Sequence, residues 1–156
     1  MRKVIAILLL AVSVPVLADT IGDLEAVIDL EMTTARLANL TSAEAYDQIP
    51  IDRFFILQGS VASTVIYDPN PDTFQAVIEL VDGKWVELQS IDIYRVYLLV
   101  EGPEYADRIF DRLPRDPGPE VIQTNQDLLV VGYLYGYSDA EDGSVLPVVQ
   151  AVMVRN

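Results

Sequence analysis

The stretch FFILQGSVASTVIY, residues 54–67, decides the fold. Its apolar residues recur at every second position, which is the period of a β-strand with one buried face. Gly59 interrupts the middle of the run, where a glycine marks a bulge or a sharp bend. We therefore predict one long, bent strand that contributes to two sheets.

The same alternation continues downstream in shorter segments. A turn at 68–72 leads into a predicted strand over 73–80. Asp82-Gly83 is a dipeptide typical of two-residue hairpin turns, so a return strand is predicted over 84–88. Another strand is predicted over 94–100, where apolar residues again alternate.

One helix interrupts the strands. It is predicted to open at Pro103, because proline suits the first helical position, and to stop before Pro114. Its apolar stripe consists of Tyr105, Ile109, Phe110 and Leu113. Two final strands are predicted over 128–137 and 145–154, joined by a hairpin loop that contains Gly143.

The order of these elements over residues 53–155 is β-β-β-α-β-β, which resembles the OB-fold, a five-stranded Greek-key barrel. The predicted fold class is therefore mainly β with helices (α+β). In detail, we expect a five- to six-stranded OB-like small barrel with one helix between strands 3 and 4 and an N-terminal helical arm. A different small β-barrel or a sandwich with a helical arm is the alternative.

The last hairpin carries a second, local resemblance. Residues 132–134, Gly143 and residues 146–149 are similar to the end of exported OB-like proteins, among them the starvation-inducible outer-membrane lipoproteins. Those lipoproteins carry a lipidated cysteine. This chain has no Cys, so the resemblance implies export without a lipid anchor.

Three segments are expected along the chain: a signal peptide (1–18), an N-terminal helical arm (19–50) and an OB-like β-barrel domain (51–156). Arg2 and Lys3 precede an apolar run that is too short to span a membrane, and small or aliphatic residues lead up to Ala18. We expect export to the periplasm or the extracellular space, cleavage after Ala18, and no stable membrane insertion afterwards.

The arm contains two capping signals. Thr20 and Asp23 precede apolar residues at helical spacing, which predicts a helix over 21–38. Thr41 and Glu44 predict a second, short helical turn. The arm either packs against the barrel or serves as a docking helix.

Charge limits the possible partners. The chain has 24 acidic and 10 basic residues and a formal net charge of −14. Binding of a phosphate backbone or of an anionic lipid surface relies on Lys and Arg, so we expect neither nucleic acid nor anionic lipid as a partner. The acidity indicates either solubility alone or adaptation to high salt or divalent cations.

The residue types present also limit the chemistry. The absence of His and Cys excludes a Ser-His-Asp triad, a Cys nucleophile and a His/Cys zinc site. No carboxylate pair stands out for glycoside hydrolysis. Acidic turns contain Asp68, Asp72, Asp139, Glu141 and Asp142, but the second turn does not have the spacing of an EF-hand loop. We expect no enzymatic activity, no catalytic residue, no cofactor and no bound metal.

Tyr133, Tyr135 and Tyr137 alternate along one predicted strand and therefore share one face. OB-folds use aromatic side chains as stacking platforms, so these three are the candidate ligand-binding residues. In the alternative interpretation, the tyrosines cover the barrel or receive the N-terminal helix.

These observations lead to one function hypothesis and two alternatives. The hypothesis is an exported, non-catalytic binding or interaction module of the cell envelope, which contacts a protein or a glycan through the aromatic strand face. The first alternative is a structural subunit that self-assembles through the N-terminal helix or a sheet edge. The second is a small carboxylate-dependent hydrolase. The sequence leaves the oligomeric state open.

Overall fold

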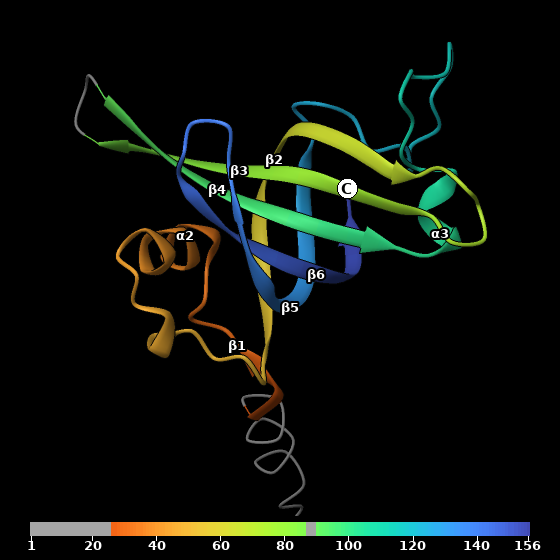
Figure 1. Cartoon of the computed structure of the whole chain (residues 1–156). Coiled ribbons are helices and arrows are strands. Elements are labelled where there is room, and N and C mark those ends of the chain that lie inside the picture. The colour runs from red at the N-terminus through yellow and green to blue at the C-terminus, as the bar shows by residue number, and fades with distance from the viewer. Residues whose placement is uncertain (1–25, 87–89) are drawn as a thin grey trace, which may run out of the picture.

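The computed structural model describes residues 26–86 and 90–156 (Figure 1). The predicted signal peptide therefore lies outside the described residues. The elements are β1 (Ile28–Asp29), α2 (Thr34–Ser42), the 3-10 helix η1 (Tyr46–Gln48), β2 (Phe54–Asp68), β3 (Gln75–Val86), β4 (Ser90–Glu101), α3 (Pro103–Ala106), β5 (Asp127–Asp139) and β6 (Val145–Arg155).

Within the described residues, five strands close into a barrel. β2 pairs antiparallel with β3, and β3 with β4; β4 pairs parallel with β6, β6 antiparallel with β5, and β5 returns antiparallel to β2. With α3 between β4 and β5, this is the topology of the OB-fold, so the predicted fold class is confirmed. β1 pairs parallel with the start of β2 as a sixth strand.

β2 bends at Gly59, as the sequence predicts. The first half of β2, up to Ser60, pairs with β5, and the second half pairs with β3. A Cβ atom at Gly59 would lie 2.7 Å from the carbonyl oxygen of Val81. Glycine is therefore required where β2 changes partner, because no side chain fits between the two strands.

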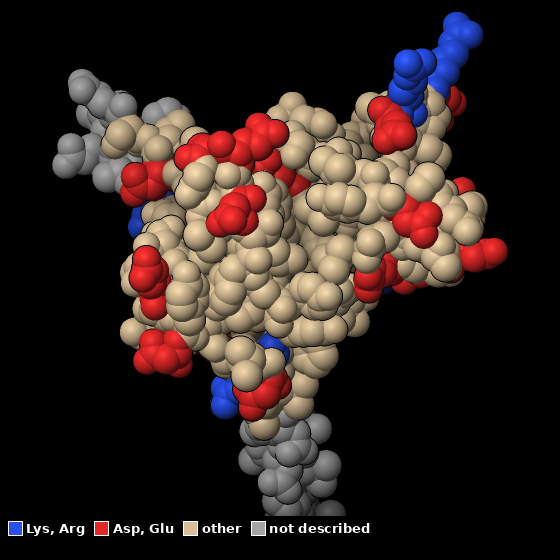
Figure 2. All heavy atoms as spheres, viewed as in Figure 1, with Lys and Arg blue, Asp and Glu red and all other residues tan. Residues whose placement is uncertain are grey.

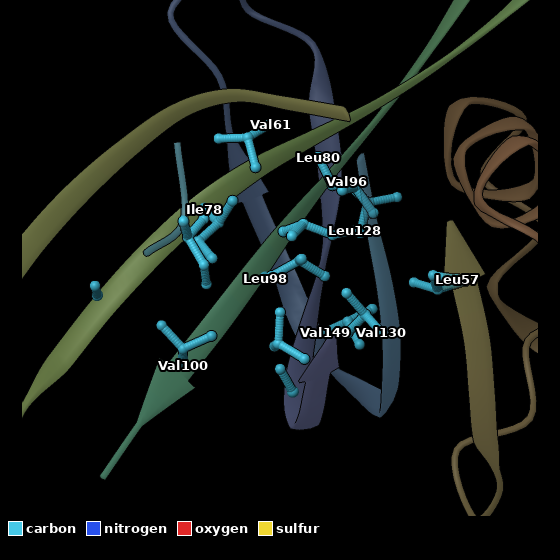
Figure 3. Packing of buried hydrophobic residues seen from close by; sticks show 14 of the residues in the cluster. Leu57, Val61, Ile78, Leu80, Val96, Leu98, Val100, Leu128, Val130 and Val149 are labelled. Atoms are coloured by element: carbon cyan, nitrogen blue, oxygen red, sulfur yellow. The ribbon is translucent and has the colours of Figure 1, made fainter. Parts of the chain in front are cut away.

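Alternate residues of all five barrel strands fill the interior. Figure 3 shows Val61, Ile78, Leu98, Val130 and Val149 among the buried side chains, and each is almost completely inaccessible to solvent. α2 lies against β4 and β6 and buries Leu37. The described residues before β2 therefore belong to the folded unit.

The helix predicted over 21–38 is correct only at its end: residues 34–38 belong to α2, whereas residues 28–33 are not helical. The side chain of Asp29 accepts hydrogen bonds from the amides of Glu31 (2.9 Å) and Met32 (3.0 Å), and this turn breaks the helical run. The hydroxyl of Thr33 then accepts from the amide of Arg36 (3.2 Å) and caps α2. The capping box predicted at Thr41 and Glu44 also fails, because Thr41 lies inside α2. A short helical turn does form before Pro50, but it is η1, whose N-cap residue is Ala45.

Two downstream predictions are also corrected. Asp82-Gly83 is not a turn: β3 runs through it, in register with Tyr94 and Ile93 of β4. The predicted helix from Pro103 towards Pro114 ends at Ala106. Just beyond the helix, the backbone carbonyl of Arg108 accepts a hydrogen bond from the amide of Ile122 (2.8 Å), so this part of the chain pairs with the later loop instead of continuing the helix.

Among the described residues, every helix is too short or too polar to cross a lipid bilayer.

Candidate ligand-binding groove

A groove of about 820 Å³ crosses the outer face of β2, β3 and β4. Strand register places its floor in rows: Ser63, Glu79 and Tyr97 are consecutive cross-strand neighbours, and Val65, Val77 and Leu99 form the next row. The end of β5 and the loop that follows it form one wall, with Ser138, Asp139 and Glu141. OB-folds bind their ligands on this strand face, between the loops that follow the first and fourth barrel strands.

Two tyrosines give the groove its aromatic character. Tyr67 is 67% exposed near the end of β2, and Tyr97 is partly buried in β4. The apolar side chains of Val65, Val77 and Leu99 lie in the same lining. A flat ring or an alkyl chain that enters the groove therefore finds apolar contacts as well as two ring faces.

The lining carries more negative than positive charge. Glu79, Asp139 and Glu141 contribute three carboxylates, and Arg95 is the one cation among the described residues of the lining. More widely, the acidic side chains on the face seen in Figure 2 lie on its upper part and toward its edges, and the lower middle of that face is largely uncharged.

Arg95 is held by two carboxylates. Its Nε atom donates to Oε1 of Glu79 at 2.7 Å, and its Nη1 atom donates to Oδ2 of Asp142 at 2.5 Å. The hydrogen bond to Glu79 is the main reason why the pKa of Arg95 is raised above its ordinary value. Because this charge is already paired, Arg95 has little left to attract an anion.

The loops at the two ends of the groove are fixed by their own side chains. In the loop after β2, the hydroxyl of Thr73 donates to Asp68 (2.6 Å) and the amide of Asn70 does so too (2.9 Å), which lowers the pKa of Asp68. In the loop before β6, the hydroxyl and the amide of Ser144 donate to Asp142 and lower the pKa of Asp142 to about 2. Both loops are thus pre-formed.

Within the described residues, no three acidic side chains form a group that could hold a metal ion.

The predicted site residues lie on a different surface. Tyr133, Tyr135 and Tyr137 share the outer face of β5 and all keep part of their side chains exposed. The ring of Tyr137 lies 4.6 Å from that of Tyr46 in η1, and the ring of Tyr133 lies edge-on to Phe54 at 5.8 Å. Tyr135, 66% exposed, is the most open of the three. A ligand-binding role for this stripe stays a prediction.

Sequence reasoning missed the groove because its residues come from separate strands. The strict alternation predicted over residues 54–67 would place Tyr67 on the same face as Phe55, Leu57 and Gly59, all three of which are buried. The bulge between Val61 and Ser63 shifts the alternation, so that Tyr67 points to the outside. A shift of the alternation by one residue after Val61, rather than strict alternation along the whole strand, places Tyr67 on the outer face.

No protein-family model matches the chain, and no curated protein matches it. Solved structures do match. One is the protein PriB from Ralstonia solanacearum, at 14% sequence identity and a TM-score of 0.40, covering 66% of this chain and 95% of that one. A single-stranded DNA-binding protein from Streptomyces coelicolor matches at 12% identity and a TM-score of 0.40, covering 66% of this chain and 90% of that one.

A small single-stranded DNA-binding protein from Mycoplasma pneumoniae matches at 7% identity and a TM-score of 0.39, covering 66% of this chain and 91% of that one.

Two predictions about the partner of this protein are corrected. Nucleic acid was excluded as a partner, and a cell-envelope protein or glycan was favoured instead. Neither prediction stands beside these findings, since two of the matching structures are named as single-stranded DNA-binding proteins.

Proposed function

We propose that this protein is a non-catalytic OB-fold binding module that holds a small organic cation, such as a polyamine, in the groove on β2, β3 and β4. One observation carries the proposal: Tyr67 and Tyr97 lie in the same lining as the carboxylates of Asp139 and Glu141. Arg95, the one cation of the described lining, is already paired with Glu79 and Asp142. A cation gains from the carboxylates and from the negative faces of the rings, and its alkyl segments gain from the valines of the floor.

Single-stranded nucleic acid is a second candidate ligand for the same groove. The observation that favours it is the presence of Tyr67 and Tyr97 on the strand face where OB-folds stack bases. Stacking would have to supply the affinity, because the phosphates would face Glu79, Asp139 and Glu141. Added salt would screen that repulsion, so binding should strengthen as the salt concentration rises, opposite to the usual dependence.

The two candidates are separated by titration of the purified protein with spermidine and with an oligothymidine, each at low and at high NaCl. Spermidine is expected to bind at low salt, to shift NMR resonances of the groove residues, and to be released by salt. Absence of spermidine binding at low salt would overturn the first candidate. Oligothymidine binding that strengthens with salt would support the second.

The chain offers a matched pair of variants that locate the binding site. Tyr67 and Tyr135 are equally exposed, but Tyr67 lines the groove and Tyr135 lies on the outer face of β5. Tyr67→Ala is expected to weaken spermidine binding about two- to fivefold, the range of an exposed cation–π contact. Tyr135→Ala should leave binding unchanged; an equal loss in both variants would show that the groove is not the site.

Export is a separate proposal about residues 1–18. We propose that this segment is removed after Ala18, on the strength of its two basic residues, its apolar run and the small residue at the cleavage position. The local resemblance to exported lipoproteins supports export and, without a Cys, implies no lipid anchor. N-terminal sequencing of the protein expressed in a bacterial host tests this, and a mature chain that retains Met1 would overturn it.

A further inference from the structure

The ion pairs of Arg95 connect three parts of the chain. Arg95 itself is in β4, Glu79 is the neighbouring carboxylate in β3, and Asp142 belongs to the loop between β5 and β6. Glu79 is also held by the hydroxyl of Ser63 in β2, at 3.1 Å. The guanidinium is therefore anchored to the barrel at one end and meets the loop at the other.

The loop behaves as one unit because its polar groups are satisfied within it. The amide of Ala140 donates to the carbonyl of Ser144 (2.8 Å), and the amide of Gly143 donates to the carbonyl of Ala140 (2.9 Å). Asp142 uses Oδ1 for Ser144 and presents Oδ2 to Arg95. The contact between Arg95 and Asp142 therefore ties a pre-formed loop to the barrel without distorting it.

The contact between Arg95 and Asp142 lies between two hollows of the surface. Arg95 lines the groove and also lines a second hollow of about 610 Å³, which is bordered by Asn39 of α2, by Tyr94 and by Asp142. Asp139 and Glu141, from the segment that Asp142 ties down, belong to the wall of the groove. The position of this wall depends on whether Asp142 stays on Arg95.

We propose that Arg95 is a positioning residue: it holds the β5–β6 loop as the wall of the groove, and so sets the groove's width and its affinity for ligand. The effect on ligand affinity rests on the function proposed above, whereas the role of Arg95 in holding the loop does not. A guanidinium suits this task because Nε and Nη1 reach two carboxylates on different elements at once. A lysine at this position would keep the charge and lose one of the two contacts.

The position of the loop is measured without any ligand. The chain has no Cys, so nitroxide labels can be placed at will on Ala62→Cys in β2 and Glu141→Cys in the loop. The electron-paramagnetic-resonance distance distribution should be narrow in the labelled parent and broader in Arg95→Lys and Asp142→Asn. Asparagine at position 142 keeps an oxygen for Ser144, so the loop's internal turn is retained. Unchanged distributions in both variants would overturn the proposal.

The effect on binding is measured with spermidine on the unlabelled protein. Arg95→Lys leaves the net charge unchanged, and its affinity should fall about two- to fivefold, the range expected from one partly exposed ion pair. If Arg95→Lys binds spermidine as tightly as the parent, the position of the loop does not set the affinity of the groove, and this part of the proposal is overturned. If the parent binds no spermidine, the proposed function fails, and the distance measurement still decides whether Arg95 holds the loop. A single cooperative melting transition in each variant confirms that it is folded.

Discussion

The hydroxyl of Thr34 satisfies both backbone polar groups of Gln58. It accepts a hydrogen bond from the amide of Gln58 at 3.2 Å and donates one to its carbonyl at 2.7 Å. Gln58 lies in the half of β2 that pairs with β5, before the pairing with β3 begins at Ser60. The first residue of α2 thus covers the open edge of the barrel at this point, where a strand would otherwise leave its backbone unpaired.

Thr34→Val should lower the free energy of unfolding by roughly 1–2 kcal/mol, because the isosteric side chain leaves two partly buried backbone groups without a partner. Urea denaturation measures this loss. Thr41→Val is the matched control, since Thr41 is equally buried in α2 and its hydroxyl donates to Leu37 within the same helix (2.9 Å). The carbonyl of Leu37 can still accept from its own helix, so the control should lose less. Equal losses would contradict the role of Thr34 at the barrel edge.

Gly59→Ala should destabilise the protein by about 1–3 kcal/mol, the usual cost of forcing an atom into a packed site. The added Cβ would lie 2.7 Å from the carbonyl oxygen of Val81, and a strand backbone cannot move aside cheaply. Gly136→Ala in β5 provides the comparison, because a Cβ there meets nothing within 4 Å. The control should stay within about 0.5 kcal/mol of the parent in the same urea titration. A Gly59→Ala variant as stable as Gly136→Ala would show that β2 bends for another reason.

The sequence predicts the barrel well because its strands carry local signals. The alternation on either side of Gly59 and the helix that opens at Pro103 are both properties of short windows, and together they indicate the OB order. The prediction of a turn at Asp82-Gly83 is wrong because pairing with another strand decides the structure there. Its local preference is overridden by register with β4, which continues through Gly83 paired with Ile93.

The candidate site was harder to predict than the fold. Tyr67 and Tyr97 come from different strands, and nothing in either local sequence indicates that one groove contains both. The stripe of Tyr133, Tyr135 and Tyr137 was visible because its three members lie on one strand. Sequence patterns therefore favour sites built on a single element, whereas the groove depends on the order in which the strands close the barrel.

Tyr46→Ala should lower the pKa of Tyr137 towards its ordinary value of 10.0. Burial is the main reason why the pKa of Tyr137 is raised, and the ring of Tyr46 lies 4.6 Å from it. Removal of the Tyr46 ring admits water, which stabilises the phenolate. An NMR titration of ring-labelled tyrosine at position 137 measures the shift. Tyr135→Ala is the control and should leave the pKa of Tyr137 as it is; an unchanged pKa in Tyr46→Ala would show that η1 does not shield this ring.

The β5–β6 loop should keep its turn down to unusually low pH. The pKa of Asp142 is lowered from 3.8 to about 2, first by the hydroxyl of Ser144 and then by its amide and by Arg95. A carboxyl group whose pKa is lowered on folding stabilises the folded state fully above its ordinary pKa, and this contribution is lost as the pH falls from about 4 to about 2. Carboxyl-carbon NMR of Asp142 should therefore show its inflection near pH 2.

Ser144→Ala removes the largest cause of that shift and should raise the pKa of Asp142 towards its ordinary value. Thr73→Ala is the matched control, because the hydroxyl of Thr73 plays the same part for Asp68 in the loop after β2. That variant should raise the pKa of Asp68 and leave the inflection of Asp142 near pH 2. If Ser144→Ala leaves the inflection of Asp142 in place, the ion pair with Arg95 rather than the turn itself holds the carboxylate charged.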